Sequence, residues 1–294
     1  MDQGPLTGRI VAAFDAMPAQ LQTAARYLLD RPRDVALLSM REQARQAGVQ
    51  PATMTRLAKR LGLDGYDTVR EMYAETIRNA GPGFSRKAGA QVASQKQKGD
   101  RALAAEMVAT LNGHVARLSE PGALDRLAAA AAKLAAARRI SCVGLRACHP
   151  VAWHLHYVLS LVGARTVLLD SVAGTGRDPL RDAGAPDVLF AVSIAPYTRV
   201  TIETARYAHQ QGVPVVALTD SEVSPLAALA AETIFVATDC PSFFHTMAPA
   251  FVTAEILGAL VAGRGGTKAL EALRRTEEQL AAFNVHWTQN GRTA

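Results

Sequence analysis

Two apolar runs, residues 188–194 and 213–218, each end in side chains whose hydroxyl groups could bind a ligand. The length and β-branched content of both runs predict buried strands, and the residues between them have the periodicity of a helix that starts after Thr198 and stops at Gly212. Parallel strands of such a β-α-β unit end at one edge of the sheet, where open α/β folds bind ligands. We expect a small-molecule site there, formed by Ser193, Thr198, Thr219, Ser221 and Ser224.

A guanidinium group stands at a third position of this kind, because Arg146 follows the predicted strand 139–143. Arginine offers bidentate hydrogen bonds to phosphate or carboxylate, so Arg146 could anchor an anion. A surface salt bridge with Asp170 or Asp220 is an equal alternative. Both interpretations stay open at this point.

Other reactive side chains have no spacing that demands catalysis or metal binding. His149, His154 and His156 do not share one helical face, and the cysteines, odd in number, lack metal-ligand spacing. An isomerase would need an acid/base pair, for which His154, His245 or Glu255 could serve. We therefore expect no metal and no cofactor, and we assign no catalytic residue.

The stretch 39–63 predicts two short helices joined by a tight turn at Gly48. Ser39 and Glu42 form a capping box, and the second helix, from Pro51, has one apolar face. Its other face would carry amide, hydroxyl and cationic groups that suit the major groove of DNA. The expected DNA-contacting residues are Gln50, Thr53, Thr55, Arg56, Lys59 and Arg60. An ordinary helical hairpin with a solvated polar face is the alternative.

The distribution of charge favours DNA. The net charge of the 294 residues is +6, and residues 1–101 hold 16 Lys and Arg against 10 Asp and Glu, whereas the remainder is balanced. A localised basic excess is typical of nucleic-acid binding, although a solvated basic surface has the same charge. No apolar run is long enough to span a membrane and no secretion signal begins the chain, which predicts a cytoplasmic protein without a membrane partner.

The elements that must position these residues indicate two domains. Helical periodicity runs through residues 9–79, and five short strands alternate with helices after residue 138. The expected fold class is α/β: an all-α helix-turn-helix domain followed by a three-layer αβα sandwich with a five-stranded parallel sheet. We place the DNA-binding domain at 1–80, a basic linker, flexible or loosely helical, at 81–100, and the effector-binding and oligomerisation domain at 101–294.

The chain resembles the RpiR/MurR-type transcriptional regulators. Val49, Ala52-Thr53, Arg56 and Leu61-Gly62 match their N-terminal motif, and residues 138–262 are similar to their sugar isomerase (SIS) domain. The resemblance implies a bacterial regulator of sugar or amino-sugar metabolism whose SIS domain binds a phosphosugar and mediates oligomerisation. The resemblance supports Gly144, Ser193, Thr198 and Thr219 as effector-binding residues. The full expected set is Gly144, Arg146, Cys148, Ser193, Thr198, Thr219 and Ser221.

The loops depart from the phosphate-binding pattern of that family. Arg146 replaces a glycine, Cys148 and Ala195 replace serines, and Pro196 replaces another glycine. The site therefore loses two hydroxyls and gains a cation. We expect a DNA-binding regulator that is controlled by a small anionic metabolite, a phosphosugar or related sugar acid. We expect it to act on a double-stranded DNA operator as a homo-oligomer, either a dimer or a tetramer. The alternative function is a sugar-phosphate isomerase or another SIS-domain enzyme.

Overall fold

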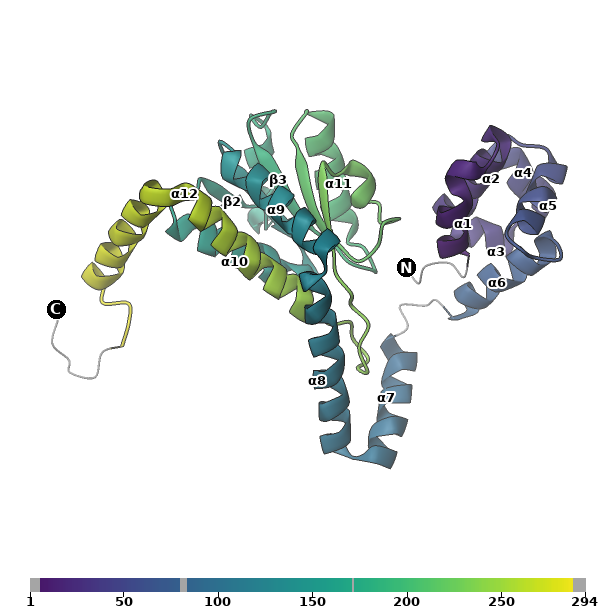
Figure 1. Cartoon of the computed structure of the whole chain (residues 1–294), viewed down its shortest axis with the longest axis horizontal. Helices are drawn as coiled ribbons and strands as arrows, with labels where there is room; N and C mark the ends of the chain where they lie inside the picture. The colour runs from purple at the N-terminus through teal and green to yellow at the C-terminus, as the bar shows by residue number, and fades with distance from the viewer. Residues whose placement is uncertain (1–5, 80–83, 171, 288–294) are drawn as a thin grey trace. The chain divides into compact units, whose positions relative to one another are not determined.

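The computed structural model describes residues 6–79, 84–170 and 172–287, which form two compact units, Met1–Ala90 and Gln91–Ala294. The first unit is all-helical (Figure 1). Its helices are α1 (Thr7–Ala13), α2 (Ala19–Asp30), α3 (Pro32–Leu37), α4 (Met40–Ala47), α5 (Pro51–Arg60) and α6 (Tyr66–Asn79). Among the described helices of the chain, none is long and apolar enough to cross a membrane.

A buried polar network holds the first unit together beside its apolar core. Gln43 on α4 is fully buried and donates to the carbonyl oxygens of Val35 and Leu38, at 2.9 and 2.8 Å. The hydroxyl of Tyr66, at the start of α6, donates to the amide oxygen of Gln43. Because the network satisfies carbonyls that the end of α3 leaves without partners, it fixes α4 against α3 and α6.

The second unit contains a five-stranded parallel sheet in the order β2-β1-β3-β4-β5. Apolar runs buried on both faces account for its central strands. The strands are β1 (Ile140–Gly144), β2 (Thr166–Leu168), β3 (Val188–Val192), β4 (Val215–Thr219) and β5 (Glu232–Phe235). The α/β fold class is confirmed.

Helices cover both faces of the sheet (Figure 1). One face packs against three helices: α9 (Pro121–Ala136), α10 (His149–Leu161) and α12 (Ala248–Ala282). The other face packs against α11 (Arg199–Gln210). The sequence predicts separate helices before and after residue 264, and the structure joins them as α12, which bends where Gly266 leaves the helical conformation.

The segment between the two predicted domains is helical where it is described. Residues Phe84–Lys98 form α7, and Asp100–Ala116 form α8 after a break at Gly99. The division between the two compact units falls inside α7, after Ala90. Within the second unit, the side-chain oxygen of Gln91 accepts a hydrogen bond from the backbone N–H of Phe243, 2.8 Å away, in the loop before α12.

Candidate functional site

The loops that follow β3 and β4 are fastened together by their hydroxyl groups. The hydroxyl of Thr219 donates to the carbonyl oxygen of Ser193 at 2.7 Å and lies 2.8 Å from the hydroxyl of Ser224. The oxygen of Ser224 accepts from the backbone N–H of Leu226, which closes the loop after β4. The predicted meeting of the two loops at one edge of the sheet is therefore observed, and hydrogen bonds hold the loops there.

An acidic side chain that the sequence analysis considered only as a salt-bridge partner lies between the same loops. The carboxylate of Asp220 accepts a hydrogen bond from the backbone N–H of Ala195, 3.1 Å away. The hydroxyl of Tyr197 also hydrogen-bonds to Asp220 and Ser224, and burial raises the pKa of this phenol. A negative charge thus belongs to the site, next to a backbone N–H that could otherwise bind a ligand anion. Its position directly after Thr219, at the end of β4, was the available sequence signal.

Most of the predicted effector-binding side chains are buried. The exposed fractions are 1% for Ser193, 0% for Thr219, 6% for Ser221 and 5% for Cys148. The hydroxyl oxygen of Ser193 accepts from the backbone N–H of Thr198, and that of Ser221 from Val223. Thr198 begins α11 and is half-buried, and its own side chain makes no capping hydrogen bond. In this conformation the hydroxyls of Ser193 and Ser221 hold the loops together.

The loop after β1 approaches its own helix closely at Gly144. A β-carbon at this position would lie 2.6 Å from the carbonyl oxygen of Cys148, which explains why a glycine stands here. The thiol of Cys148 contacts the backbone of Ile194, and burial raises its pKa, so the group stays a neutral thiol. The loops after β1 and β3 are thereby neighbours.

Arg146 is the exposed cation of this edge. Its backbone has a φ of 56°, in the left-handed region that residues other than glycine rarely adopt and that is enriched at functional sites. Among the residues that the structure describes, Arg146 forms no ion pair with Asp220, and its side chain faces solvent.

The side chains considered for acid/base catalysis lie on α10, in the loop before α12 and on α12 itself. The ring of His154 on α10 packs 4.5 Å from that of Phe251 on α12, and the ring of His245 stacks 4.0 Å from Phe244. Glu255 on α12 is exposed, so its carboxylate pays no cost of burial. Ring packing accounts for both histidines.

A second candidate surface is the outer face of α5 in the first unit. Ser39 caps α4 by accepting from the N–H of Glu42, and Gly48 ends α4 in the left-handed conformation, with φ 68°. These features set α5 at a fixed angle to α4, while its residues Met54 and Leu57 are fully buried. The predicted pair of helices with a tight turn is present.

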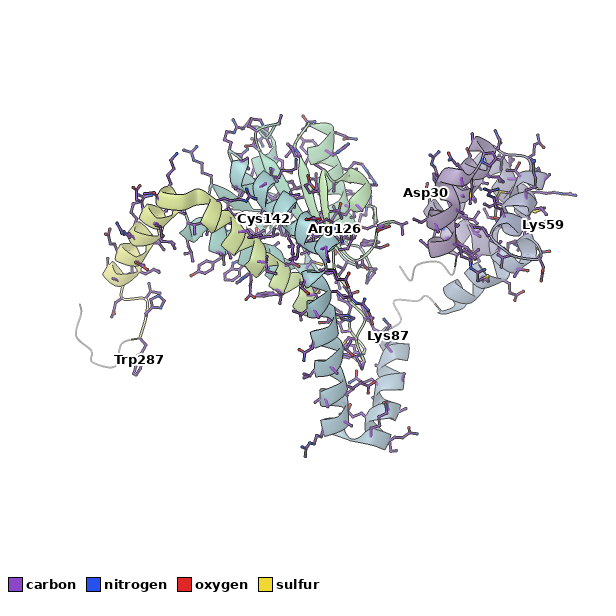
Figure 2. All side chains as sticks on the ribbon, viewed as in Figure 1. Asp30, Lys59, Lys87, Arg126, Cys142 and Trp287 are labelled. Atoms are coloured by element: carbon purple, nitrogen blue, oxygen red, sulfur yellow. The ribbon has the colours of Figure 1, made fainter. Side chains whose placement is uncertain are left out.

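The exposed residues of α5 and its N-cap differ from the predicted set at one position. Gln50, Arg56, Lys59 and Arg60 are exposed and Thr55 is half-buried, and Figure 2 shows Lys59 on the outer side of the unit. Thr53, in contrast, is 2% exposed, so its expected outward position is wrong. Thr53 is one residue before Met54 and four before Leu57, which turns it toward the core. Arg60 donates to the carbonyl oxygen of Ala16, at 2.6 Å.

Comparisons with known proteins find a domain match inside the second unit. Residues 133–258 match the family model described as the SIS domain. The sugar isomerase domain of an RpiR transcription factor from Sphaerobacter thermophilus is 27% identical, with a TM-score of 0.54, over 60% of this chain and 97% of that one. The NanR protein of Vibrio vulnificus, solved in complex with ManNAc-6P, is 23% identical, with a TM-score of 0.53, over 94% of this chain and 98% of that one. No curated protein matches the chain.

Proposed function

We propose that this protein is a DNA-binding transcriptional regulator whose affinity for its operator is changed by a small anionic metabolite bound to the SIS domain. The observation that carries the proposal is the exposed polar face of α5, where Gln50, Arg56 and Lys59 stand on a capped, well-packed helix pair. One of the neighbours reported above is named as a transcription factor, and its sugar isomerase domain resembles this one in sequence and fold. The other was solved in complex with the phosphosugar ManNAc-6P.

The chemistry of the α5 face suits a DNA major groove. Arginine and glutamine can make bidentate hydrogen bonds to guanine and adenine, and lysine neutralises phosphate. The helix is held rigidly by its buried face, so little conformational entropy is lost when it binds. Thr53 is excluded from this set by its burial, and Arg60 holds the chain at Ala16. Gln50, Thr55, Arg56 and Lys59 therefore remain as the proposed DNA-contacting residues.

Substitution of single α5 side chains tests this proposal. Arg56→Ala should cost about 1 to 3 kcal/mol of operator binding and relax sequence preference, whereas Lys59→Ala should weaken binding to all sequences and reduce the salt dependence. Fluorescence anisotropy with operators from a genomic selection measures both effects. Arg31→Ala removes the same charge from an exposed position between α2 and α3 and should change little. Wild-type protein without sequence preference would contradict the proposal.

The effector is proposed to bind beside the loops after β1, β3 and β4. Arg146 supplies a positive charge there, and Asp220 supplies a negative charge that is already bonded to Ala195. An anion must therefore bind on the Arg146 side of the loops, and its hydroxyl groups can donate to Asp220. A phosphosugar or sugar acid combines these features, which makes this class of compound the first to screen.

Two substitutions with opposite expected signs test the effector site. Hydrogen bonds to charged groups contribute about 1.5 to 3 kcal/mol, so Arg146→Ala should weaken effector binding roughly tenfold or more. Asp220→Asn keeps an acceptor for the N–H of Ala195 but removes a charge that repels anions, so it should strengthen binding. Isothermal titration with hits from a thermal-shift screen of sugar phosphates and sugar acids measures both.

Arg199→Ala is the control for these titrations, because Arg199 is exposed at the same edge but is paired with Glu203. Equal affinities for all three variants would show that the effector binds elsewhere.

We further propose that the protein is a cytoplasmic homo-oligomer. Trp153 and Tyr157 on α10 are 46% and 43% exposed, and their rings stack in parallel with centroids 5.4 Å apart. Large aromatic rings are enriched at subunit interfaces, where they bury much area at little entropic cost. This stacked pair supports an interface formed by α10.

A further inference from the structure

A group of cationic side chains lies where the strands begin, at the edge of the sheet opposite the loops described above. Here a cavity of about 350 Å³ is lined by Arg138, Arg139, Arg165 and Asp182. Arg138 and Arg139 precede β1, and Arg165 precedes β2. Three arginines therefore gather around one cavity with one carboxylate in its wall.

One of the three arginines already has a partner. The guanidinium group of Arg138 makes two hydrogen bonds to the carboxylate of Asp187, at 2.9 and 2.7 Å. Asp187 is 1% exposed and also accepts from the backbone N–H of Gly184. This carboxylate is thus engaged by Arg138 and the chain, and it ties the beginning of β3 to that of β1.

The other two arginines are not satisfied in this way. Arg139 comes no closer than 3.9 Å to Asp187, and its Nε and Nη2 atoms are buried without a hydrogen-bond partner. Buried guanidinium donors without acceptors are unfavourable. Among the described residues, Arg165 has no ion-pair partner, and its side chain is exposed. Arg139 is therefore left with one ion-pair contact, at 3.9 Å, and no hydrogen bond at its Nε and Nη2 atoms, and Arg165 has no ion pair among the described residues.

The register of the strands places these two cations side by side. Ile140 pairs with Thr166 in the parallel ladder, so the residues before them, Arg139 and Arg165, begin adjacent strands at the same level. Side chains at the same level of neighbouring strands point to the same face of a sheet. Like charges at this spacing repel each other, and an anion between them would remove the repulsion.

We propose that this cavity, defined by Arg138, Arg139, Arg165 and Asp182, binds the oxyanion group, phosphate or carboxylate, of a small molecule. Its volume lies within the range of small-ligand pockets. Arg139 and Arg165 hold the oxyanion, and Asp182 accepts from hydroxyl or amino groups of the same molecule. A small ligand is favoured over a nucleic acid because the cavity holds only about 350 Å³. This site is separate from the proposed effector site.

Titration of the full chain with inorganic phosphate and with citrate, at constant ionic strength, tests the proposal. Calorimetry should detect at least one of the two anions bound to the wild type, and Arg165→Gln should weaken this binding at least tenfold. Arg165 is exposed, so the variant should fold, which circular dichroism verifies. Whichever anion binds more tightly identifies the oxyanion that the cavity prefers.

Two further variants separate this site from other sources of anion binding. Arg117→Gln removes an exposed charge from the segment before α9 and should leave the phosphate and citrate titrations unchanged. Arg146→Ala reports anion binding at the proposed effector site instead. Loss of binding in Arg146→Ala alone, or equal weakening in Arg165→Gln and Arg117→Gln, would overturn the proposal. Wild-type protein that binds neither anion would overturn it as well.

The side chain of Arg139 provides a direct readout. Its Nε–H has no acceptor in the protein, so the ¹⁵Nε signal of Arg139, assigned by comparison with Arg139→Lys, should shift on addition of the anion. The signal of Arg138, which is bonded to Asp187, should shift less. An unchanged Arg139 signal at an anion concentration that saturates the calorimetric binding would overturn the assignment of the cavity.

Discussion

At the scale of single residues, a few close contacts determine the shape of the loops at the carboxyl edge of the sheet. The hydroxyl of Thr219 holds the backbone of Ser193, and Gly144 allows β1 to pass close to Cys148. The shape of this edge thus rests on residues that hold the loops in place. Gly144 is the clearest case, since any side chain would collide with backbone atoms.

Gly144→Ala should destabilise the second unit. The new β-carbon would lie 2.6 Å from the carbonyl oxygen of Cys148 and 3.0 Å from its carbonyl carbon, so the loop must shift, at a cost of about 1 to 3 kcal/mol. Thermal unfolding followed by circular dichroism measures the loss. Gly113→Ala, in the last turn of α8 with no atom within 4 Å, should instead stabilise the protein by up to about 1 kcal/mol. Equal effects of the two substitutions would contradict this account of the loop.

At the scale of elements, a buried ion pair joins the beginnings of β1 and β3. The hydrogen bonds from Arg138 hold the pKa of the Asp187 carboxyl below its usual range, and the N–H of Gly184 acts in the same direction. A carboxyl group whose pKa is lowered on folding stabilises the protein above its unfolded pKa, about 4, and this contribution is lost as the pH falls through the folded pKa. The pair therefore stabilises the sheet at neutral pH, and this stabilisation is lost in acid.

Arg138→Ala should lower the free energy of unfolding by about 1 to 3 kcal/mol at pH 7, because it leaves a buried carboxylate with fewer partners while half of the arginine is exposed and screened. The difference from the wild type should shrink as the pH falls below about 4 and through the lowered pKa of Asp187 in the folded protein. Urea denaturation across this pH range measures the difference. Arg181→Ala breaks an exposed pair with Asp178 and should have little effect at any pH. A difference that is independent of pH would exclude Asp187 as its source.

At the scale of the whole molecule, the two compact units divide inside α7. Residues before position 101 also contribute to the second unit, because the side chain of Gln91 accepts a hydrogen bond from the backbone N–H of Phe243. His114 on α8 lies 2.8 Å from the carbonyl oxygen of Asp239 in the same loop. The loop before α12 is therefore held from two helices.

A fragment of residues 91–294 should fold, form oligomers and bind the effector, but it should not bind the operator. Light scattering, circular dichroism and anisotropy measure these properties. A shorter fragment of residues 101–294 lacks Gln91 and should be cleaved faster by chymotrypsin near Phe243, while its sheet stays folded. If the longer fragment is unfolded or monomeric, the first 90 residues are required for the core or for assembly.

The sequence alone predicts the architecture of this protein because its patterns are local. Apolar strands, capped helices and the turn at Gly48 are determined by the periodicity, β-branching and backbone preferences of neighbouring residues. For that reason the five strands, the parallel sheet and the α4–α5 pair agree with the prediction. The periodicity of α5 also predicts which of its polar residues are exposed, except at Thr53, which lies beside the apolar face and is buried.

Tertiary structure decided how each side chain of the candidate sites is used. The hydroxyls of Ser193, Thr219 and Ser224 form hydrogen bonds within and between loops, and Asp220 binds a backbone N–H that lies 25 residues earlier in the chain. The arginines before β1 and β2 are far apart in the sequence, and only the register of the strands brings them together. Secondary structure depends mainly on adjacent residues, so the sequence determined it. Hydrogen-bond partners and burial depend on contacts between distant segments, so only the tertiary structure decided them.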